Sequence, residues 1–217
     1  MTKTVSKVYK YIKSVLIDDN AHGLEHVERV RNWAVKIAKS EKYKDLELVE
    51  IVSLLHDIGF SKTNKWSEHA ELGSKMAMGF LRKNNLLSSE KIAHIGTAII
   101  NHSVSLKNQD QLVCIIRDAD MLDMVGAIGI IRTLISQNMR SVYDKNNIKG
   151  VLWKSDYKKA YDNYNSEIGA GKTIIDQLNF QIHCLNEIKT KYARKEALIR
   201  CKYITNFILE FDREIKV

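Results

Sequence analysis

The residues with the clearest capacity for chemistry are a neighbouring histidine and aspartate, His56 and Asp57. They follow the apolar run 48–55, which predicts a buried helix over 45–58, and Gly59 just beyond them is a predicted helix stop. Ionisable side chains at the buried end of a helix cost free energy unless a partner satisfies them. A divalent metal ion would do so by accepting an imidazole nitrogen and a carboxylate oxygen. On the dipeptide alone, the simpler hypothesis is a core histidine that is hydrogen-bonded to the aspartate beside it.

Two more histidines and an arginine lie upstream with helical spacing. His22, His26 and Arg29 stand at i, i+4 and i+7, so they share a neighbouring face if the helix begins early. His26 falls inside the predicted helix, whereas His22 precedes Gly23 and is expected at or just outside its N-terminus. The group is either a solvated edge or a ligand histidine with an anion-holding arginine beside it.

Three further histidines follow the first pair. His69 lies near the start of a helix predicted over 68–84, His94 lies in a helix predicted over 91–100, and His102 follows the end of that helix. Each could be a structural residue. Together they could form a second metal shell or a phosphate-binding wall.

A second apolar run, in the helix predicted over 111–124, ends in three aspartates. Asp118, Asp120 and Asp123 close this run, and the last two are one turn apart on one face. Without a cation these two carboxylates would repel each other. A helix rich in small residues is predicted next, over 125–135, with Arg132 toward its end.

The elements that must position these residues are helical. Among 217 residues there is no proline and there are only 10 glycines, while hydrophobic residues reach 45%, enough for a core. We predict an all-α chain of one domain, with a metal-site core over about 22–135 and C-terminal helices over 155–217 packed on it. Segment 138–156 is predicted to be the least structured. The inward residues predicted for helix 68–84 are Leu72, Met76, Gly79 and Phe80.

The net charge of +8 suits polyanions, such as nucleotides, nucleic acid or an acidic surface. Lysine used as a solubilising surface residue is the simpler explanation. Lys62 and Lys65 lie in a polar loop predicted over 60–67, directly after the His-Asp pair. They are equally consistent with ordinary loop lysines and with side chains that meet a phosphate.

Cysteine usage and hydropathy indicate the compartment. The three cysteines are far apart and form no paired motif, which favours a reducing cytoplasm. No stretch approaches the roughly 18 apolar residues of a membrane span, so we expect a cytoplasmic protein with no membrane partner.

A possible phosphate-binding loop in the C-terminal third lacks part of the required motif. Segment 169–173 ends in Gly-Lys-Thr, but Ser166 stands where the motif requires its first glycine. The motif also needs a buried strand before it, and 161–165 is polar. We therefore predict no P-loop.

Taken in order, His26, the His56–Asp57 pair and Asp120 resemble the H…HD…D signature of the HD-domain metal-dependent phosphohydrolases. The local contexts agree, and they read His-Gly-x-x-His-x-x-Arg-Val from residue 22, Leu-Leu-His-Asp-Ile-Gly from 54, Asp-Ala-Asp-x-Leu-Asp from 118 and Gly-Ala-Ile-Gly-Ile-x-Arg from 126. The resemblance covers roughly the whole chain and is strongest over 22–132. It implies the compact multi-helix HD-domain fold.

The resemblance also implies roles for individual residues. The metal ligands would be His26, His56, Asp57 and Asp120, with Asp118 as the competing candidate for the last position. Two nitrogens and two carboxylates leave positions open on a six-coordinate ion, which suits Mn²⁺, Fe²⁺, Co²⁺ or Mg²⁺ better than closed tetrahedral Zn²⁺. One ion is favoured over two. A second ion or an outer shell would draw on His22, His69, His94, His102 and Asp118.

Catalytic and substrate-binding roles follow in the same way. Beside Asp57, either Asp123 or His102 would orient water or protonate the leaving group. The cations that would neutralise the phosphate chain are Arg29, Lys62, Lys65 and Arg132.

The implied reaction is hydrolysis of a (deoxy)nucleoside triphosphate to monophosphate and pyrophosphate, by attack of water activated on the metal. The alternatives are a 5′-nucleotidase, a phosphohydrolase of cyclic or signalling nucleotides, and a non-catalytic helical module that binds nucleic acid or protein. Nucleic acid is the less favoured partner, and we expect a monomer or a homodimer.

Overall fold

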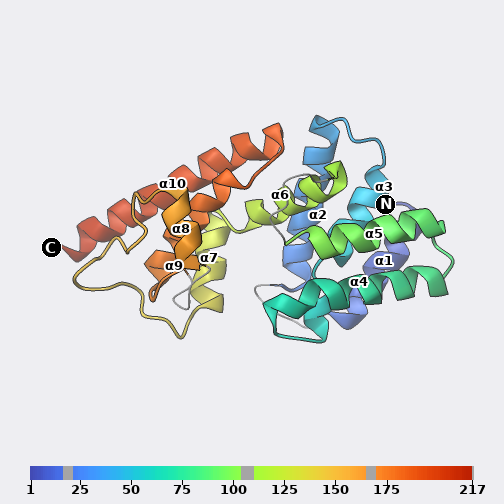
Figure 1. Ribbon diagram of the computed structural model, residues 1–217, viewed down its shortest axis with the longest axis horizontal. Coiled ribbons are helices and arrows are strands. Elements are labelled where there is room, and N and C mark those ends of the chain that lie inside the picture. Colours follow the sequence, from blue (N-terminus) through green and yellow to red (C-terminus); the bar gives the residue numbers. More distant parts are fainter. Residues whose placement is uncertain (17–21, 104–109, 165–169, 217) are drawn as a thin grey trace. The chain divides into compact units, whose positions relative to one another are not determined.

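The computed structural model of the chain describes residues 1–16, 22–103, 110–164 and 170–216. These residues fold into α-helices, two short 3-10 helices and connecting segments, with no β-strand among them (Figure 1), so the all-α prediction is confirmed. The elements are α1 (Lys3–Val15), α2 (Leu24–Ser40), α3 (Leu46–Leu55), η1 (Ile58–Ser61), α4 (Trp66–Lys83), α5 (Ser89–Asn101), α6 (Gln111–Asp123), α7 (Gly126–Ser136), α8 (Tyr157–Tyr164), α9 (Ile174–His183), η2 (Cys184–Asn186) and α10 (Lys191–Ile215).

The chain divides into two compact units. Unit 1 contains residues 1–120 and 189–192, and unit 2 contains residues 121–188 and 193–217. The boundary falls inside α6, directly after Asp120. That position is earlier than the end of the expected metal-site core at about 135. The organisation as one domain, with C-terminal helices over 155–217, stays a prediction.

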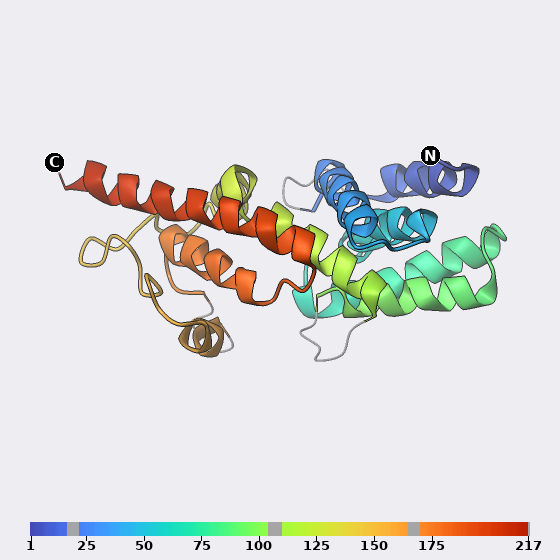
Figure 2. The same ribbon diagram turned by 90° about the horizontal axis from the view of Figure 1, so that it is seen from above.

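Unit 1 is built around α3. This helix is apolar on nearly all sides, so it is buried, and it packs against α1, α2 and α5. Its N-terminus is capped by Asp45, whose carboxylate accepts the Leu48 N–H at 3.0 Å. Helices α4 and α5 lie side by side in both views (Figures 1 and 2). Because α3 is packed among these helices, its C-terminal end and the residue that follows it, His56, are buried in unit 1.

The helix predicted over 45–58 ends earlier, at Leu55, and η1 follows it. Gly59 is required here by a close approach, because a Cβ on it would lie 1.9 Å from the carbonyl oxygen of His69. Only glycine lets η1 pack this tightly on α4. This contact places His69 beside η1, the segment that begins directly after Asp57.

The predicted inward face of α4 is wrong by about one residue. Leu72, Met76 and Phe80 are half-buried and Gly79 is exposed. The buried residues of α4 are His69, Gly73, Ser74, Ala77 and Leu81. Small side chains let a helix approach its neighbours closely, and α4 turns this small-residue face toward α5 and η1.

Unit 2 contains α7 to α10 and a long irregular stretch over 137–156, where little structure was predicted. One turn of this stretch is held by Asp176 in the first turn of α9. The Asp176 carboxylate accepts hydrogen bonds from the Val151 N–H and from the N–H and hydroxyl of Thr173. Thr173 thus caps a helix instead of completing a phosphate-binding loop, while Ser166 and Gly169 lie outside the described residues.

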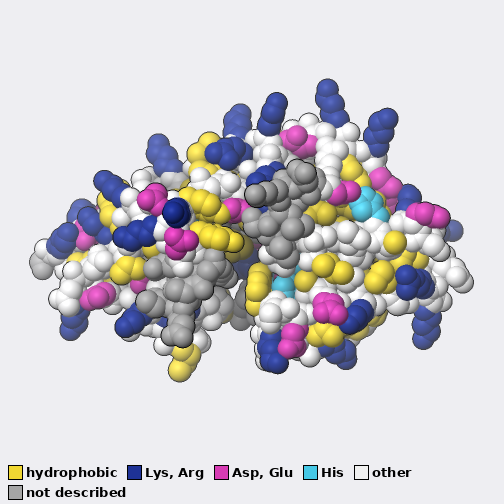
Figure 3. All heavy atoms as spheres, in the orientation of Figure 1, with side chains coloured by type: hydrophobic (Ala, Val, Ile, Leu, Met, Phe, Trp, Pro, Cys, Tyr) yellow, Lys and Arg dark blue, Asp and Glu magenta, His cyan; other side chains and the backbone are white. Residues whose placement is uncertain are grey.

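The surface carries its positive charge without a single basic patch on the face seen in Figure 3. Lysine and arginine side chains are spread over both units there and alternate with aspartate and glutamate. That distribution is typical of solubilising surface residues. Within the described part of the chain, no helix is both long and apolar enough to cross a membrane.

Candidate metal centre

Four side chains of unit 1 direct their polar atoms at a common point. His26 Nε2 lies 3.3 Å from His56 Nε2, 3.4 Å from an Asp57 oxygen and 3.4 Å from an Asp120 oxygen. His56 Nε2 lies 3.5 Å and 4.0 Å from the same two oxygens. Neighbouring ligands about 2.1 Å from an octahedral ion are roughly 3 Å apart, so the spacing of the two histidines from each other and from each carboxylate is close to that expected around one divalent cation.

The second oxygen of Asp57 faces a different pair of histidines. Asp57 Oδ1 lies 3.4 Å from His102 Nε2 and 3.8 Å from His69 Nε2. These two nitrogens are 3.4 Å from each other. The carboxylate of Asp57 thus stands between two groups of potential ligand atoms.

The proton positions of three histidines follow from their backbone contacts. The Nδ1 atoms of His56, His69 and His102 lie 2.7, 2.5 and 2.6 Å from the carbonyl oxygens of residues 53, 66 and 99, each three residues earlier. An Nδ1–H that donates to a carbonyl leaves the lone pair on Nε2. Metal-binding histidines are commonly oriented by this same outer hydrogen bond. Three Nε2 lone pairs therefore converge on one carboxylate.

The pKa values agree with ligands of the required charge. Burial lowers the pKa of His56 to about 4, so its imidazole is neutral at pH 7. Burial alone would raise the pKa of Asp57, but the surrounding histidines hold it well below its usual value. Burial lowers the pKa of His102 too, yet the nearby Asp57 carboxylate outweighs this and raises it. In the absence of a cation, a proton therefore competes for the His102 nitrogen.

Asp57 Oδ1 supplies the clearest test of whether a cation fits. The residue is 2% exposed, and this oxygen has no hydrogen-bond donor among the described residues. A buried, ionised oxygen that faces lone pairs is strongly unfavourable in an isolated protein. A divalent cation converts these same atoms into ligands, so the residues present fit such an ion.

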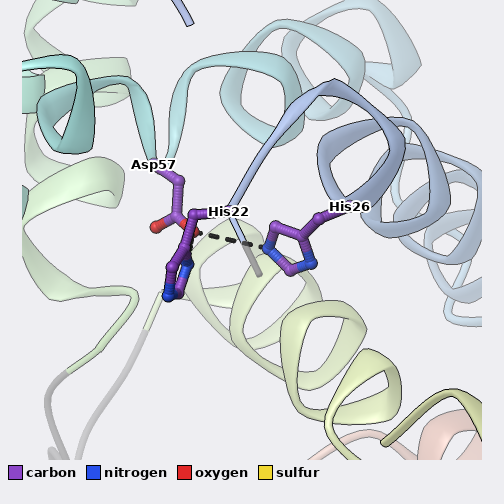
Figure 4. A group of neighbouring side chains, drawn as sticks. All are labelled: His22, His26 and Asp57. Atoms are coloured by element: carbon purple, nitrogen blue, oxygen red, sulfur yellow. Dashed lines mark hydrogen bonds and ion pairs between the residues drawn. The ribbon is translucent and has the colours of Figure 1, made fainter. Parts of the chain in front are cut away.

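His22 borders the group on its more open side. Its Nδ1 lies 2.9 Å from Asp57 Oδ2, and its side chain is 25% exposed. Figure 4 shows His22 and His26 approaching the Asp57 carboxylate from two directions. His22 is placed to orient that oxygen, or to act as a ligand on the solvent side.

Two aromatic residues line the same side, and neither was predicted as a site residue. Phe60 stacks between His22 and His69, with ring centroids 4.2 Å and 4.3 Å away. The Trp66 ring lies 4.7 Å from the His69 ring. Segment 60–67 was expected to be a polar loop, but Phe60 belongs to η1 and Trp66 begins α4. Their signal in the sequence was two large aromatic residues within ten positions of His56.

The three aspartates of α6 each have a different kind of partner. Asp120 alone reaches the histidines. Asp118, the competing ligand candidate, accepts hydrogen bonds from the Lys189 and Thr190 N–H groups and from the Thr190 hydroxyl. Asp123 belongs to unit 2, where it pairs with Arg132 at 3.1 Å. Asp120 and Asp123 are one turn apart in α6, as the sequence pattern predicts, and Arg132 supplies the positive charge beside Asp123.

The remaining candidates lie at the periphery or elsewhere. Arg29 is half-buried and lies 3.9 Å from Glu25, one turn earlier in α2. Lys62 is exposed at the end of η1, and Lys65 forms a surface ion pair with Glu68 at 2.8 Å. His94 pairs with Asp110 at 2.7 Å and is not part of the histidine group around Asp57.

Comparison with known proteins agrees with this geometry. Residues 23–125 match the HD domain family, and this segment contains every member of the group around Asp57 except His22. Over these residues the chain is similar to the HD domain, and two solved structures that share its fold are described as HD-superfamily hydrolases. The protein YpgQ of Bacillus subtilis, described as uncharacterized, is 27% identical over 220 residues, which cover 98% of this chain and 94% of YpgQ.

Solved structures share the fold over almost the whole chain. A Lactobacillus plantarum protein superposes with a TM-score of 0.73 at 21% identity and covers 100% of this chain and 98% of its own. YpgQ in complex with ADP gives 0.69 at 21% identity, with 98% and 95% covered. A predicted HD-superfamily hydrolase from an uncultured Thermotogales bacterium gives 0.64 at 24% identity, with 96% and 91% covered.

Proposed function

We propose that this protein hydrolyses nucleotides and that its preferred reaction cleaves a (deoxy)nucleoside triphosphate to the monophosphate and pyrophosphate. The observation that carries the proposal is the Asp57 carboxylate, which is buried, ionised and surrounded by histidine nitrogens. The structure of the similar protein YpgQ with ADP supports a nucleotide as the ligand class.

In this proposal His26, His56, Asp57 and Asp120 hold the ion. Once bound, a divalent ion supplies Lewis acidity toward a phosphate oxygen and makes water a better nucleophile at neutral pH. The protein's own part is to fix the ligands. The backbone carbonyl bonded to Nδ1 of His56 sets the direction of its Nε2, and His22 holds Asp57 Oδ2 from the open side.

The residues that would meet the phosphate chain are Arg29 and Lys62. Arg29 lies in α2 one turn after His26, and Lys62 follows η1, which begins directly after Asp57. Lys65 would have to leave Glu68 to join them. Arg132 and Asp123 satisfy each other in unit 2, and this pairing favours a structural role for both. If only one ion binds, His102, whose Nε2 faces Asp57, is a better candidate than Asp123 for orienting water or moving a proton.

The geometry also favours a second ion, contrary to the single ion expected. His69, His102 and Asp57 Oδ1 have mutual distances of 3.4 to 3.8 Å, similar to those of the first group. Asp57 would then bridge both ions. Pairs of ions about 3.5–4 Å apart commonly stabilise the attacking and leaving oxygens of a phosphoryl displacement.

The test is product analysis by anion-exchange chromatography after incubation with Mn²⁺ and mono-, di-, tri- and cyclic nucleotides. Asp57→Ala is the inactive control, and His94→Gln is the matched control, because it changes a histidine outside the group. Monophosphate plus pyrophosphate supports the proposal, and ¹⁸O from labelled water in the monophosphate places the attack at the α-phosphorus. Nucleoside plus phosphate would indicate a 5′-nucleotidase. No turnover in any reaction would contradict the proposal and favour a binding module.

A further inference from the structure

Trp66 is an exposed aromatic residue next to the buried polar group around Asp57. It is 49% exposed, although tryptophan is on average one of the more buried residue types. It is the first residue of α4, and its backbone carbonyl accepts the Nδ1–H that orients His69. The backbone of Trp66 is thus tied to a residue of the candidate metal centre, while a large part of its side chain stays open to solvent.

The Trp66 ring lies next to two histidines, His69 and His22, that contact Asp57. Its centroid lies 4.7 Å from the His69 ring and 6.2 Å from the His22 ring. Those two histidines in turn lie 3.8 Å and 2.9 Å from the oxygens of Asp57. Phe60 is stacked between the two histidines, and its ring centroid lies 5.9 Å from that of Trp66.

An aromatic ring in this position offers what a nucleobase binds. Bases stack on tryptophan through their π-faces, and such stacking tolerates any base. A nucleotide whose phosphates lie at Asp57 carries its base about one sugar away, and a single imidazole ring, that of His69, stands between Asp57 and the Trp66 ring. The aromatic rings thus provide an apolar wall beside a polar centre, as ligand sites commonly do.

We propose that Trp66 is the platform on which the base of the nucleotide substrate stacks. This inference rests on the proposed nucleotide phosphohydrolase function and extends it to recognition. It assigns affinity for a base of any kind to Trp66 and affinity for phosphates to the metal centre. Base-free polyphosphates therefore bind without help from Trp66.

The test separates these two affinities in one experiment. We would measure KM for a nucleoside triphosphate and the inhibition constant of inorganic tripolyphosphate in the wild type, Trp66→Leu and Trp66→Phe. In Trp66→Leu we expect KM to rise roughly five- to a hundredfold, the range for loss of one base–aromatic stack, with kcat almost unchanged. The tripolyphosphate constant stays within about twofold, and Trp66→Phe gives an intermediate KM.

A purely structural role gives a different pattern. If Trp66 only covers His69, Trp66→Leu weakens nucleotide and tripolyphosphate alike and lowers the bound metal. Equal KM values in all three proteins would also overturn the inference. Trp33→Leu is the matched control, since Trp33 lies in α2 and stacks with Lys36.

A binding measurement decides the matter if Trp66→Leu does not fold. An α,β-methylene nucleoside triphosphate should quench the tryptophan fluorescence of the wild type and of Trp33→Leu, but not that of Trp66→Phe. Quenching that persists in Trp66→Phe would overturn the inference. Absence of wild-type turnover on every nucleotide would instead remove the proposed function itself, which is a distinct result.

Discussion

Asp57 in unit 1 and Asp176 in unit 2 are equally buried carboxylates with opposite surroundings. Asp57 is 2% exposed and Asp176 is 3% exposed. Asp176 receives donors on both oxygens, from the Val151 N–H at 2.7 Å and from the Thr173 N–H and hydroxyl at 3.0 and 2.8 Å. Asp57 Oδ1 has no close hydrogen-bond partner among the described residues, and its polar neighbours are the Nε2 atoms of His102 and His69 at 3.4 and 3.8 Å.

The difference separates a structural carboxylate, Asp176, from the carboxylate that we propose as a metal ligand, Asp57. Burial alone does not distinguish the two, since both aspartates are out of water. The chemical type of the nearest neighbours does, because donors complete a carboxylate whereas acceptors leave it in need of a cation. By this criterion Asp118 belongs with Asp176, since Thr190 and Lys189 supply its donors.

The largest effect is expected from Asp57→Ala. Removing this carboxylate takes one ligand from each histidine group, so we expect bound metal and nucleotide turnover to fall to background. Metal content by mass spectrometry and turnover by chromatography measure the two effects. His94→Gln should retain both, and a metal-loaded, active Asp57→Ala protein would place the centre elsewhere.

A comparison within α6 should give the next largest effect. Asp120→Ala removes a ligand from the first group, and we expect the affinity for Mn²⁺ to drop by at least about tenfold. Asp118→Ala leaves the backbone donors of Lys189 and Thr190 unpaired, so it should lower the free energy of unfolding by ~1–3 kcal/mol with unchanged Mn²⁺ affinity. Calorimetric titration measures the Mn²⁺ affinity, and urea unfolding measures the stability. If Asp118→Ala lost Mn²⁺ affinity and Asp120→Ala did not, the assignment would be refuted.

His102→Gln tests the second histidine group alone. With two ions, we expect metal content to fall from about two per chain to about one, and turnover to fall about 10- to 100-fold. Unchanged metal content in this variant would restore the single-ion expectation.

The smallest effect on the site is expected from Asp176→Ala, the counterpart of Asp57→Ala in unit 2. Unpaired donors at Val151 and Thr173 should lower the free energy of unfolding by ~1–3 kcal/mol. Bound metal should stay at the wild-type level. Urea denaturation and metal analysis of the folded protein check both expectations. An Asp176→Ala protein that lost its metal but kept the stability of the wild type would contradict the distinction between the two carboxylates.

Much of the helical framework was predictable from the sequence, because helical periodicity and the lack of proline are local properties. The boundaries of α3 and the inward face of α4 were not, since they depend on how closely Gly59 and Gly73 let η1 approach α4. Their tight contact is a property of the packed unit and leaves no periodic pattern in either segment.

The site shows the same limit. The order of His26, His56, Asp57 and Asp120 was readable as a signature, but the partners of Asp118 and Asp123 were not. Asp118 is satisfied by backbone groups 71 and 72 residues away, and such contacts leave no local trace. Trp66 was hidden for a related reason, because its role depends on the rings that η1 and α4 bring together.

The most direct test of the central claim is a calorimetric titration of the metal-free protein with Mn²⁺, in parallel for the wild type, Asp57→Ala and Asp176→Ala. The account predicts stoichiometric binding to the wild type and Asp176→Ala and no measurable binding to Asp57→Ala. Equal binding by Asp57→Ala and the wild type would contradict it, and the buried carboxylate among the histidines would then need another explanation.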